Sequence, residues 1–519
     1  MTATAEPEVD LDLPALPTRR DEFADARRRR IVALSVFAIL AAALGLRLWH
    51  LEDRPGLEYD EPVYASVAHN LRVDGRLQVR EPIDVDESYL YHPPFYFAAL
   101  SVADRVDASP VLIARVIAAI GGVLALALMW LLLREWPGGA AAVVVLGLLA
   151  LEGWIMYTNR VGWIENAGLP IMLLGLVLYT RARAGHAFLG SVPRAYSAAG
   201  WALGCAAIFK LTLFVGILAV VIHWLIMRDE YDGHVRALRG AMRLIFFYFA
   251  TMTLIYGREF LRQVAVQFNR STGRYSSRGV VHIGDVISAF THNYAAFVGT
   301  LAFLVVAIVL LGSQLVRAAR RRSMEALRDE SSFAIAWSLA ALAFVGLLSL
   351  KYPQYMVLVL IPLMFYAGGR AAMWVCARPS GPRRWVVVGG VVLMLFGDAA
   401  AYASVALTPR VDAIAGATAY LATLPHSQLV LADEPIGASI PQPYLNIDRW
   451  VFVRTQPTPS LIAAITTKTQ RLPDSPKLRR LLATSRVLRR FHGFKGDVTV
   501  YETCVRGPCS PRPAKATGS

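Results

Sequence analysis

The stretch PVLIARVIAAIGGVLALALMWLLL, residues 110 to 133, carries a single charge, Arg115, in 24 residues. At ~1.5 Å per residue, a helix of this length crosses the ~30 Å hydrocarbon core of a membrane. Comparable apolar runs lie at 31–49, 139–157, 163–180, 240–257, 292–316, 332–350, 352–375 and 385–405, and the run 197–227 is long enough for two short helices that meet near Lys210. The sequence therefore predicts an all-α polytopic membrane bundle of about 11 transmembrane helices over residues 31–409.

The charges follow the expected membrane topology. The formal charge is +15, and Arg27 to Arg30 stand directly before the first apolar run. By the positive-inside rule this cluster holds a disordered N-terminal segment, residues 1–30, in the cytoplasm, and the first run is itself the anchor in the plasma membrane. Other arginines fall in alternate loops. The basic charge is thus explained by the membrane and does not predict nucleic-acid binding.

One segment breaks this charge pattern. Residues 258–291 contain five arginines in a loop expected outside the cell. Such a loop either faces an anionic ligand or lipid headgroup, or is a solvated basic loop.

The last hundred residues have a different character. Residues 410–519 contain no run of membrane-spanning length and include short apolar segments typical of strands, at 428–432 and 497–501. We expect a small extracytoplasmic α/β domain here. Within it, KLRRLLATSRVLRR at 477–490 predicts a basic amphipathic helix, and Cys504 and Cys509 could close a small loop.

The first external loop, residues 50–109, contains the most informative motif. Tyr59-Asp60-Glu61-Pro62 precedes a predicted interfacial helix at 62–73, and Tyr91-His92-Pro93-Pro94 follows. Acidic side chains this close to hydrocarbon are paired, hydrated or functional. Asp before a helix that has Pro in its first turn is also a favoured N-cap, so Asp60 has both a structural and a catalytic interpretation.

Further polar side chains fall on the same predicted outer face: Arg160, Glu165, Lys210, Lys351 and Tyr355. Carboxylates and cations together suit the transfer of a sugar from a lipid phosphate. A carboxylate base accepts the proton of an attacking hydroxyl, and cations hold the charge of the departing phosphate. This face of the bundle is therefore the candidate active site.

These motifs, in this order, resemble the GT-C superfamily of polyprenyl-phosphate-sugar-dependent glycosyltransferases, in the branch of protein O-mannosyltransferases and lipid A aminoarabinose transferases. The resemblance runs over residues 31–405 and implies a catalytic base at Asp60, with Glu61 orienting Asp60 or the acceptor. It also implies a donor and phosphate site formed by Tyr91, His92, Arg160, Glu165, Lys210, Lys351 and Tyr355. His92 stands where aminoarabinose transferases have Lys, and Glu165 where Asp is usual, so the sugar stays open between mannose and another hexose or pentose.

The resemblance implies an inverting transfer to a protein, lipid or cell-envelope glycan acceptor at the outer membrane face. Asp84 and Asp86 form an Asp-x-Asp pattern that could hold a divalent cation such as Mg²⁺ or Mn²⁺.

Two other functional classes compete with the transferase. A multispan transporter or flippase of a lipid-linked or anionic substrate would need ionisable residues at the bilayer midplane and an internal repeat, and the sequence shows neither. A membrane anchor for the C-terminal domain would leave the loop motifs unexplained.

Overall fold

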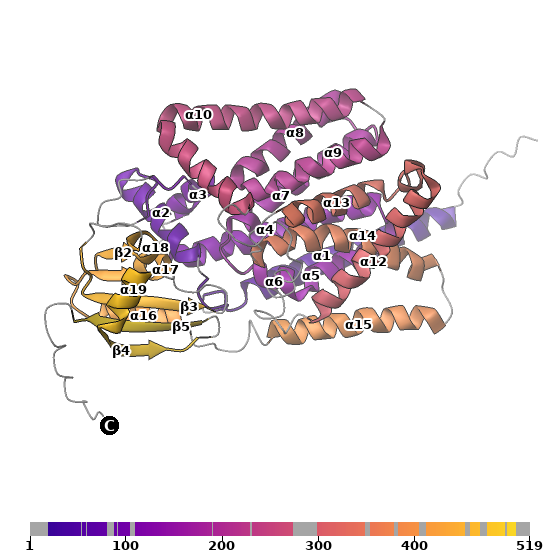
Figure 1. Cartoon of the computed structure of the whole chain (residues 1–519). Helices are drawn as coiled ribbons and strands as arrows, with labels where there is room; N and C mark the ends of the chain where they lie inside the picture. Colours follow the sequence, from indigo (N-terminus) through magenta and orange to yellow (C-terminus); the bar gives the residue numbers. More distant parts are fainter. Residues whose placement is uncertain are drawn as a thin grey trace, which may run out of the picture.

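The computed structural model describes most of the chain: residues 19–52, 54–58, 60–79, 88–90, 92–103, 109–188, 190–228, 231–272, 298–347, 353–377, 382–403, 412–451, 457–467, 475–493 and 496–504. The helices form one bundle, and a small sheet domain lies at one end of it (Figure 1). The predicted division into a helical membrane part and a C-terminal α/β part is thus seen in the described residues.

The first half of the bundle follows the predicted apolar runs. Its helices are α1 (Arg19–Leu48), α4 (Pro110–Glu135), α5 (Gly139–Leu151), α6 (Gly153–Thr158), α7 (Ile164–Arg183), α8 (Val192–Phe209), η1 (Leu211–Phe214), α9 (Val215–Met227) and α10 (Tyr231–Thr272). The run 197–227 does divide at Lys210. α10 is kinked at Gly257, where φ is +55°, a conformation that glycine adopts readily.

The second half contains α12 (Val298–Arg321), η2 (Met324–Leu327), α13 (Ser332–Leu347), η3 (Pro353–Met356), α14 (Val357–Ala377) and α15 (Pro382–Tyr402). By length and composition, five helical segments of the described chain can cross a membrane: Ala26–Leu48, Pro110–Glu135, Asp232–Val266, Gly299–Arg321 and Val357–Ala377. Several shorter apolar helices accompany them. The count of eleven spans stays a prediction.

The start of α1 differs from the expected disorder of residues 1–30. Helix α1 begins at Arg19, whereas residues 1–18 lie outside the described part. The segment RRDEFADARRRR contains six arginines and two alanines, both strong helix formers, so the helix of the first apolar run continues back through it.

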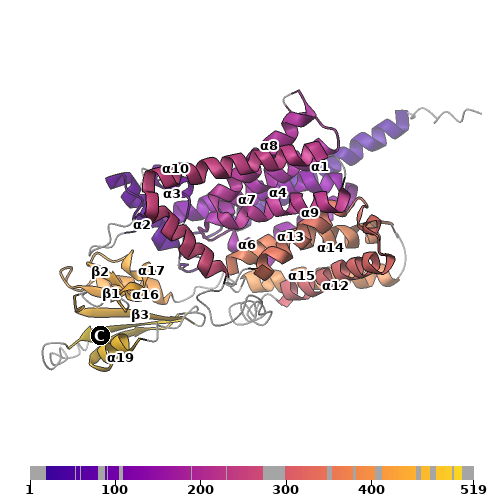
Figure 2. The same cartoon turned by 45° about the horizontal axis from the view of Figure 1, so that its top comes forward.

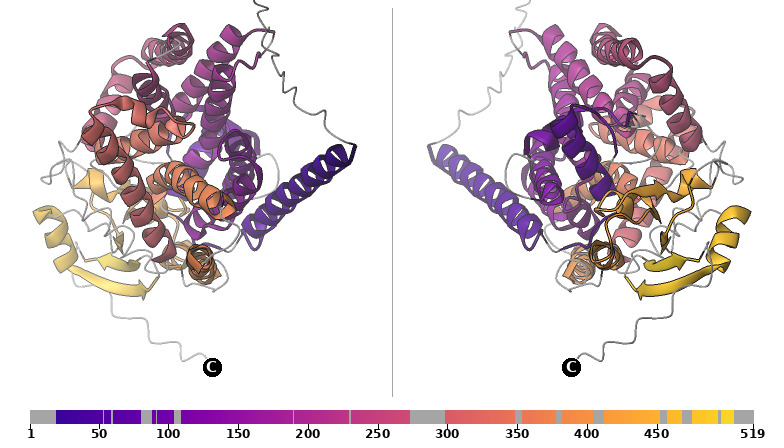
Figure 3. Two further views of the ribbon diagram at one scale, coloured as in Figure 1. Left: turned by 90° about the vertical axis from the view of Figure 1, so that its right-hand side faces the viewer. Right: turned by 90° about the vertical axis from the view of Figure 1, so that its left-hand side faces the viewer.

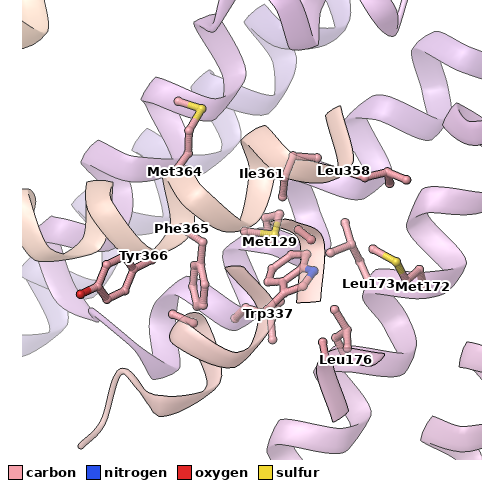
Figure 4. Packing of buried hydrophobic residues seen from close by; sticks show 14 of the residues in the cluster. Met129, Met172, Leu173, Leu176, Trp337, Leu358, Ile361, Met364, Phe365 and Tyr366 are labelled. Carbon is pink, nitrogen blue, oxygen red and sulfur yellow. The ribbon is translucent and has the colours of Figure 1, made fainter. Parts of the chain in front are cut away.

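The core of the bundle is an apolar cluster in which α13 and α14 pack together, with α4 and α7 beside them. Trp337 of α13 lies with its ring centroid 5.9 Å from that of Phe365 on α14. Figure 4 shows Met129, Leu173 and Leu176 around the same tryptophan. Since all five side chains are at most 2% exposed, this contact fixes the two halves of the bundle against each other.

Helices α8 and α10 approach closely along small residues. A methyl group at Gly204 would lie 2.8 Å from the carbonyl oxygen of Ala241, and one at Gly200 would overlap the carbonyl oxygen of Ala237. Small residues allow this backbone contact, which is a common way for membrane helices to associate.

The C-terminal domain has a five-stranded sheet of order β2-β1-β3-β5-β4. Its elements are α16 (Ala413–Ala422), β1 (Val430–Ala432), α17 (Glu434–Gly437), β2 (Tyr444–Asn446), α18 (Ile447–Trp450), β3 (Leu461–Thr467), α19 (Pro476–Ala483), β4 (Ser485–Phe491) and β5 (Gly496–Thr503). β2, β1 and β3 are parallel, and β5 joins β3 and β4 antiparallel. The strands predicted at 428–432 and 497–501 are β1 and β5.

The predicted helix at 477–490 is wrong in its second half. α19 ends at Ala483, and Ser485 to Phe491 form the edge strand β4. Pairing of β4 with β5 overrides the helical spacing, and the arginines of β4 suit an exposed sheet edge. Cys504 is disulfide-bonded, and Cys509 lies outside the described residues.

The sheet domain docks on the chain between α1 and α4. The amide of Leu57 donates a 2.5 Å hydrogen bond to Oδ2 of Asp412, whose Oδ1 caps the first turn of α16. Helix α17 lies against α2 (Asp60–Asp74), as the view in Figure 2 also shows. The domain therefore lies beside the loop that carries Asp60.

We expect Gly200→Ala to lower the melting temperature of the purified protein by several degrees, because the added methyl has no room and overpacking costs roughly 1–3 kcal/mol. Gly390→Ala in α15, where nothing lies within 4 Å of the new methyl, is the matched control and should leave the melting temperature unchanged or slightly higher. Equal melting temperatures for both variants would contradict the close contact of α8 with α10.

Candidate active site

A buried ion pair holds the chain between α1 and α4 to the bundle. Arg115 of α4 binds Glu61 of α2 through two parallel hydrogen bonds, Nε to Oε1 and Nη2 to Oε2, each 2.8 Å long. The remaining bonds of Arg115 go to backbone carbonyls of Leu51, Glu52 and Gly56. The only charge in the stretch 110–133 is therefore neutralised, and it anchors the chain between α1 and α2.

Glu61 is also held by backbone amides. Its carboxylate accepts hydrogen bonds of 2.9 Å from the amides of Glu58 and Gly162. Burial alone would raise its pKa, but Arg115 and these bonds hold the pKa of Glu61 below its ordinary value. Both oxygens are occupied by the protein, so Glu61 is an ionised positioning residue in this conformation.

The turn between α6 and α7 is fixed by a second arginine. Arg160 is buried and donates to the carbonyls of Leu46 (2.7 Å), Trp49 (2.6 Å) and Arg54 (2.9 Å). These carbonyls lie at and after the C-terminal end of α1, where helix acceptors lack intrahelical partners. In this structure the guanidinium of Arg160 serves these backbone acceptors, and its contact with a donor phosphate stays a prediction.

The structure does bring Lys210, Glu165 and His92 together. Nζ of Lys210 lies 3.4 Å from Oε1 of Glu165 and 3.4 Å from Nε2 of His92. Lys210 sits between α8 and η1, and Glu165 in the first turn of α7. Three residues widely separated in sequence thus form one charged cluster at the outer ends of these helices.

Asp60 belongs to the same electrostatic neighbourhood. It lies in the first turn of α2 and is half-buried. Burial raises the pKa of Asp60 to about 6, with Lys210 opposing the rise and Glu165 adding to it. Asp60 is thus a carboxyl group that exchanges its proton near neutral pH, as a general base requires.

Glu165 has unused acceptor capacity. Both of its carboxylate oxygens are buried, and neither accepts a hydrogen bond from the described residues. Buried acceptors in native proteins normally have a donor. The carboxylate therefore leaves places for ligand hydroxyl groups beside Lys210.

The segment around His92 is positioned by aromatic packing and by α10. The rings of Tyr64 and Tyr89 meet His92 edge-on at 5.8 and 5.9 Å. Beyond the kink of α10, the Gln263 side chain accepts from the Leu90 amide (2.8 Å) and donates to the Ser88 carbonyl (2.6 Å). The basic segment after Gly257 is, in its described part, a helix that holds this loop. α3 (Phe95–Ala103) follows directly.

The other predicted site residues divide into two groups. Tyr355 is half-buried in η3 at the head of α14. Tyr91, Lys351, Asp84 and Asp86 lie outside the described residues. No group of three or more His, Cys, Asp or Glu side chains in the described part is arranged to hold a metal ion.

Two contributors were missed by the sequence analysis. Arg115 had a visible signal, because a lone charge in an apolar run requires a partner. Gln263 had no visible signal in the sequence, because its bonds to Ser88 and Leu90 depend on the kink at Gly257.

Comparison with solved structures shows what this architecture resembles. ArnT from Cupriavidus metallidurans superposes with TM-score 0.57 in its complex with undecaprenyl phosphate (18% identity) and 0.59 in the apo state (16% identity), covering 90% of this chain and 97% of ArnT in each case. The chain shares the fold of ArnT. The oligosaccharyltransferase AglB from Archaeoglobus fulgidus, in complex with an inhibitory peptide and a dolichol-phosphate, matches with TM-score 0.52 at 13% identity over 80% of this chain and 64% of AglB.

No protein-family model and no curated protein sequence matches the chain. At these low identities the GT-C likeness concerns the fold. The assignment of site residues therefore depends on the geometry of the charged cluster.

We predict that Glu61→Gln destabilises the protein by about 3 kcal/mol, because it leaves the buried Arg115 charge unpaired. The matched control is Glu135→Gln, at the exposed end of α4, the helix that carries Arg115. It should cost less than about 1 kcal/mol. The measurement is the free energy of unfolding in mixed detergent micelles. A Glu61→Gln protein as stable as its control would mean that the pair does not hold the loop.

Proposed function

We propose that the chain is an inverting glycosyltransferase that moves a sugar from a polyprenyl-phosphate donor to an acceptor hydroxyl at the outer face of the plasma membrane. The observation that carries the proposal is the half-buried Asp60 carboxyl, with its raised pKa, near the Lys210–Glu165–His92 cluster at the end of a GT-C bundle.

Each residue has a distinct role in the proposed reaction. Asp60 takes the proton of the acceptor hydroxyl as its oxygen bonds to the anomeric carbon. The bond from that carbon to the phosphate oxygen breaks, and Lys210 stabilises the charge on the departing polyprenyl phosphate. A single displacement inverts the anomeric configuration. Glu61 positions Asp60 through the helix that they share.

The donor class follows from the cluster and from the similar structures. ArnT and AglB were solved with undecaprenyl phosphate and a dolichol-phosphate. In this chain, Lys210 and His92 offer donors to a phosphate, and Glu165 offers acceptors to sugar hydroxyls. Tyr91, Lys351 and Tyr355 stay predicted donor contacts, and Asp84 and Asp86 a predicted site for a divalent cation.

The topology completes the proposal. With eleven spans and a cytoplasmic N-terminus, the cluster and the C-terminal domain both lie outside the cytoplasm. Because the domain docks on the loop that carries Asp60, it also borders the space from which an acceptor approaches. The acceptor is a protein, lipid or cell-envelope glycan.

Membranes containing the protein should transfer radiolabelled sugar from one member of a panel of polyprenyl-phosphate donors carrying mannose, glucose, arabinose or aminoarabinose. Asp60→Asn should reduce the rate at least ~100-fold, the scale of a lost general base. Asp74→Asn, on an exposed residue of the same helix α2, is the matched control and should retain the wild-type rate. Equal transfer by both variants would refute the role of Asp60, and substrate accumulation in vesicles without transfer would favour a transporter.

The rate should also depend on pH in a defined direction. Below about pH 6 Asp60 is protonated, so the rate should rise about tenfold per pH unit and level off above the pKa. Lys210 favours the carboxylate, so Lys210→Ala should move the inflection to higher pH. The negative charge of Glu165 disfavours the carboxylate form of Asp60, so Glu165→Gln should move the inflection to lower pH. The measurement is the single-turnover rate from pH 4.5 to about 8.5 for the three proteins, and shifts in one common direction would contradict this electrostatic arrangement.

A further inference from the structure

A groove at the opposite end of the bundle from the charged cluster has no part in the proposed reaction. It has a volume of about 580 Å³ and runs along α1, with Trp130 of α4 and Gly139 of α5 on its other side. Val32, Val36 and Leu40 line its length, and Arg28 and Arg29 line one end. It therefore combines a long apolar floor with a cationic end.

The length of the groove matches one leaflet of a membrane. Arg28 and Leu40 are twelve residues apart on α1, which is ~18 Å of helix. Half of a hydrocarbon core is ~15 Å deep. If the arginines lie at the cytoplasmic interface, as the positive-inside rule predicts, Leu40 lies near the bilayer midplane.

Helix α1 leaves this groove open because its first half stands away from the bundle (Figure 3). Along residues 26–40 only Val36 is buried, whereas Leu34 and Phe37 are 68% and 72% exposed. Toward the other end of α1, Ala43 and Arg47 are buried, and Arg47 donates to the carbonyl of Ala150 in α5. The described residues therefore leave these large apolar side chains uncovered, on a helix long and apolar enough to cross a membrane.

The charge at the open end selects among lipids. Arg28 and Arg29 are exposed, and Arg28 lies next to Gly139 at the N-terminal end of α5. The cytoplasmic leaflet is the one that attracts basic segments through its anionic headgroups, at about 1 kcal/mol for each Lys or Arg near the surface. Guanidinium groups also match phosphate in geometry.

From this match of length, polarity and charge we propose that the groove is a binding site for one anionic phospholipid of the cytoplasmic leaflet. Its phosphate contacts Arg28 and Arg29, and one acyl chain lies along Val32, Val36 and Leu40 against Trp130. The bound lipid thereby fills the gap between α1 and the helices α4 and α5. This inference is independent of the glycosyltransferase reaction.

The test is native mass spectrometry of the full chain released from nanodiscs of equal parts phosphatidylglycerol and phosphatidylcholine. The wild type should retain one phosphatidylglycerol preferentially. Arg28→Gln/Arg29→Gln should lower its occupancy about tenfold or more, from two lost charges near the surface. Arg27→Gln/Arg30→Gln removes the same charge from neighbouring positions that do not line the groove, and should retain the lipid.

A second pair of variants tests the apolar floor. Ala33→Trp fills the groove and should displace the lipid with all arginines intact, whereas Ala38→Trp, on an exposed residue outside the groove, should not. If both arginine double variants lose phosphatidylglycerol equally, the binding depends only on general surface charge, and the proposed site is refuted. Retention by Ala33→Trp, or preferential retention of added undecaprenyl phosphate over phosphatidylglycerol, would overturn it as well.

Discussion

The ion pair between Arg115 and Glu61 is the constraint on which the outer half of the molecule depends. An arginine inside an apolar stretch of membrane-spanning length must be neutralised and fully hydrogen-bonded. Arg115 achieves this by recruiting Glu61 and three loop carbonyls, and Glu61 in turn binds the amide of Gly162. The pair thereby ties α4 to the loop after α1, to α2 and to the turn before α7.

The other buried arginines of the described chain also donate to backbone carbonyls. Arg47 donates to Asn159 and to the carbonyls of Ala43 and Ala150, and Arg160 donates to carbonyls around the end of α1. At the outer rim of the bundle, helices end and their carbonyls lose intrahelical partners. Arginines supply several donors to these carbonyls at once, and Arg160, a predicted phosphate ligand, serves the backbone in this structure.

Local patterns in the sequence predicted local structure well. The helix expected at 62–73, the division of 197–227 at Lys210 and the strand at 428–432 all occur, because each depends on hydrophobic periodicity or on a short apolar run. The strand β4 depends on its antiparallel pairing with the next strand, β5, and the contacts of Arg160 are with residues more than 100 positions away. The periodicity of each segment alone does not encode these partners. The meeting of Lys210 with His92 was predicted only as a shared face of the bundle, and the folded structure supplies its 3.4 Å separation.

The adjacent carboxyl groups of Asp60 and Glu61 show how one helix start can provide two chemical roles. Consecutive residues of a helix point about 100° apart, so Glu61 can face Arg115 while Asp60 faces the region of Lys210. The ion pair keeps the pKa of Glu61 low, and burial raises the pKa of Asp60 to about 6. Environments that separate the pKa values of neighbouring acids are typical of sites where one acid transfers protons and the other holds a fixed charge. Because the fixed charge is the one that anchors α2, Asp60, the proposed base, is held in place with no ion-pair partner among the described residues.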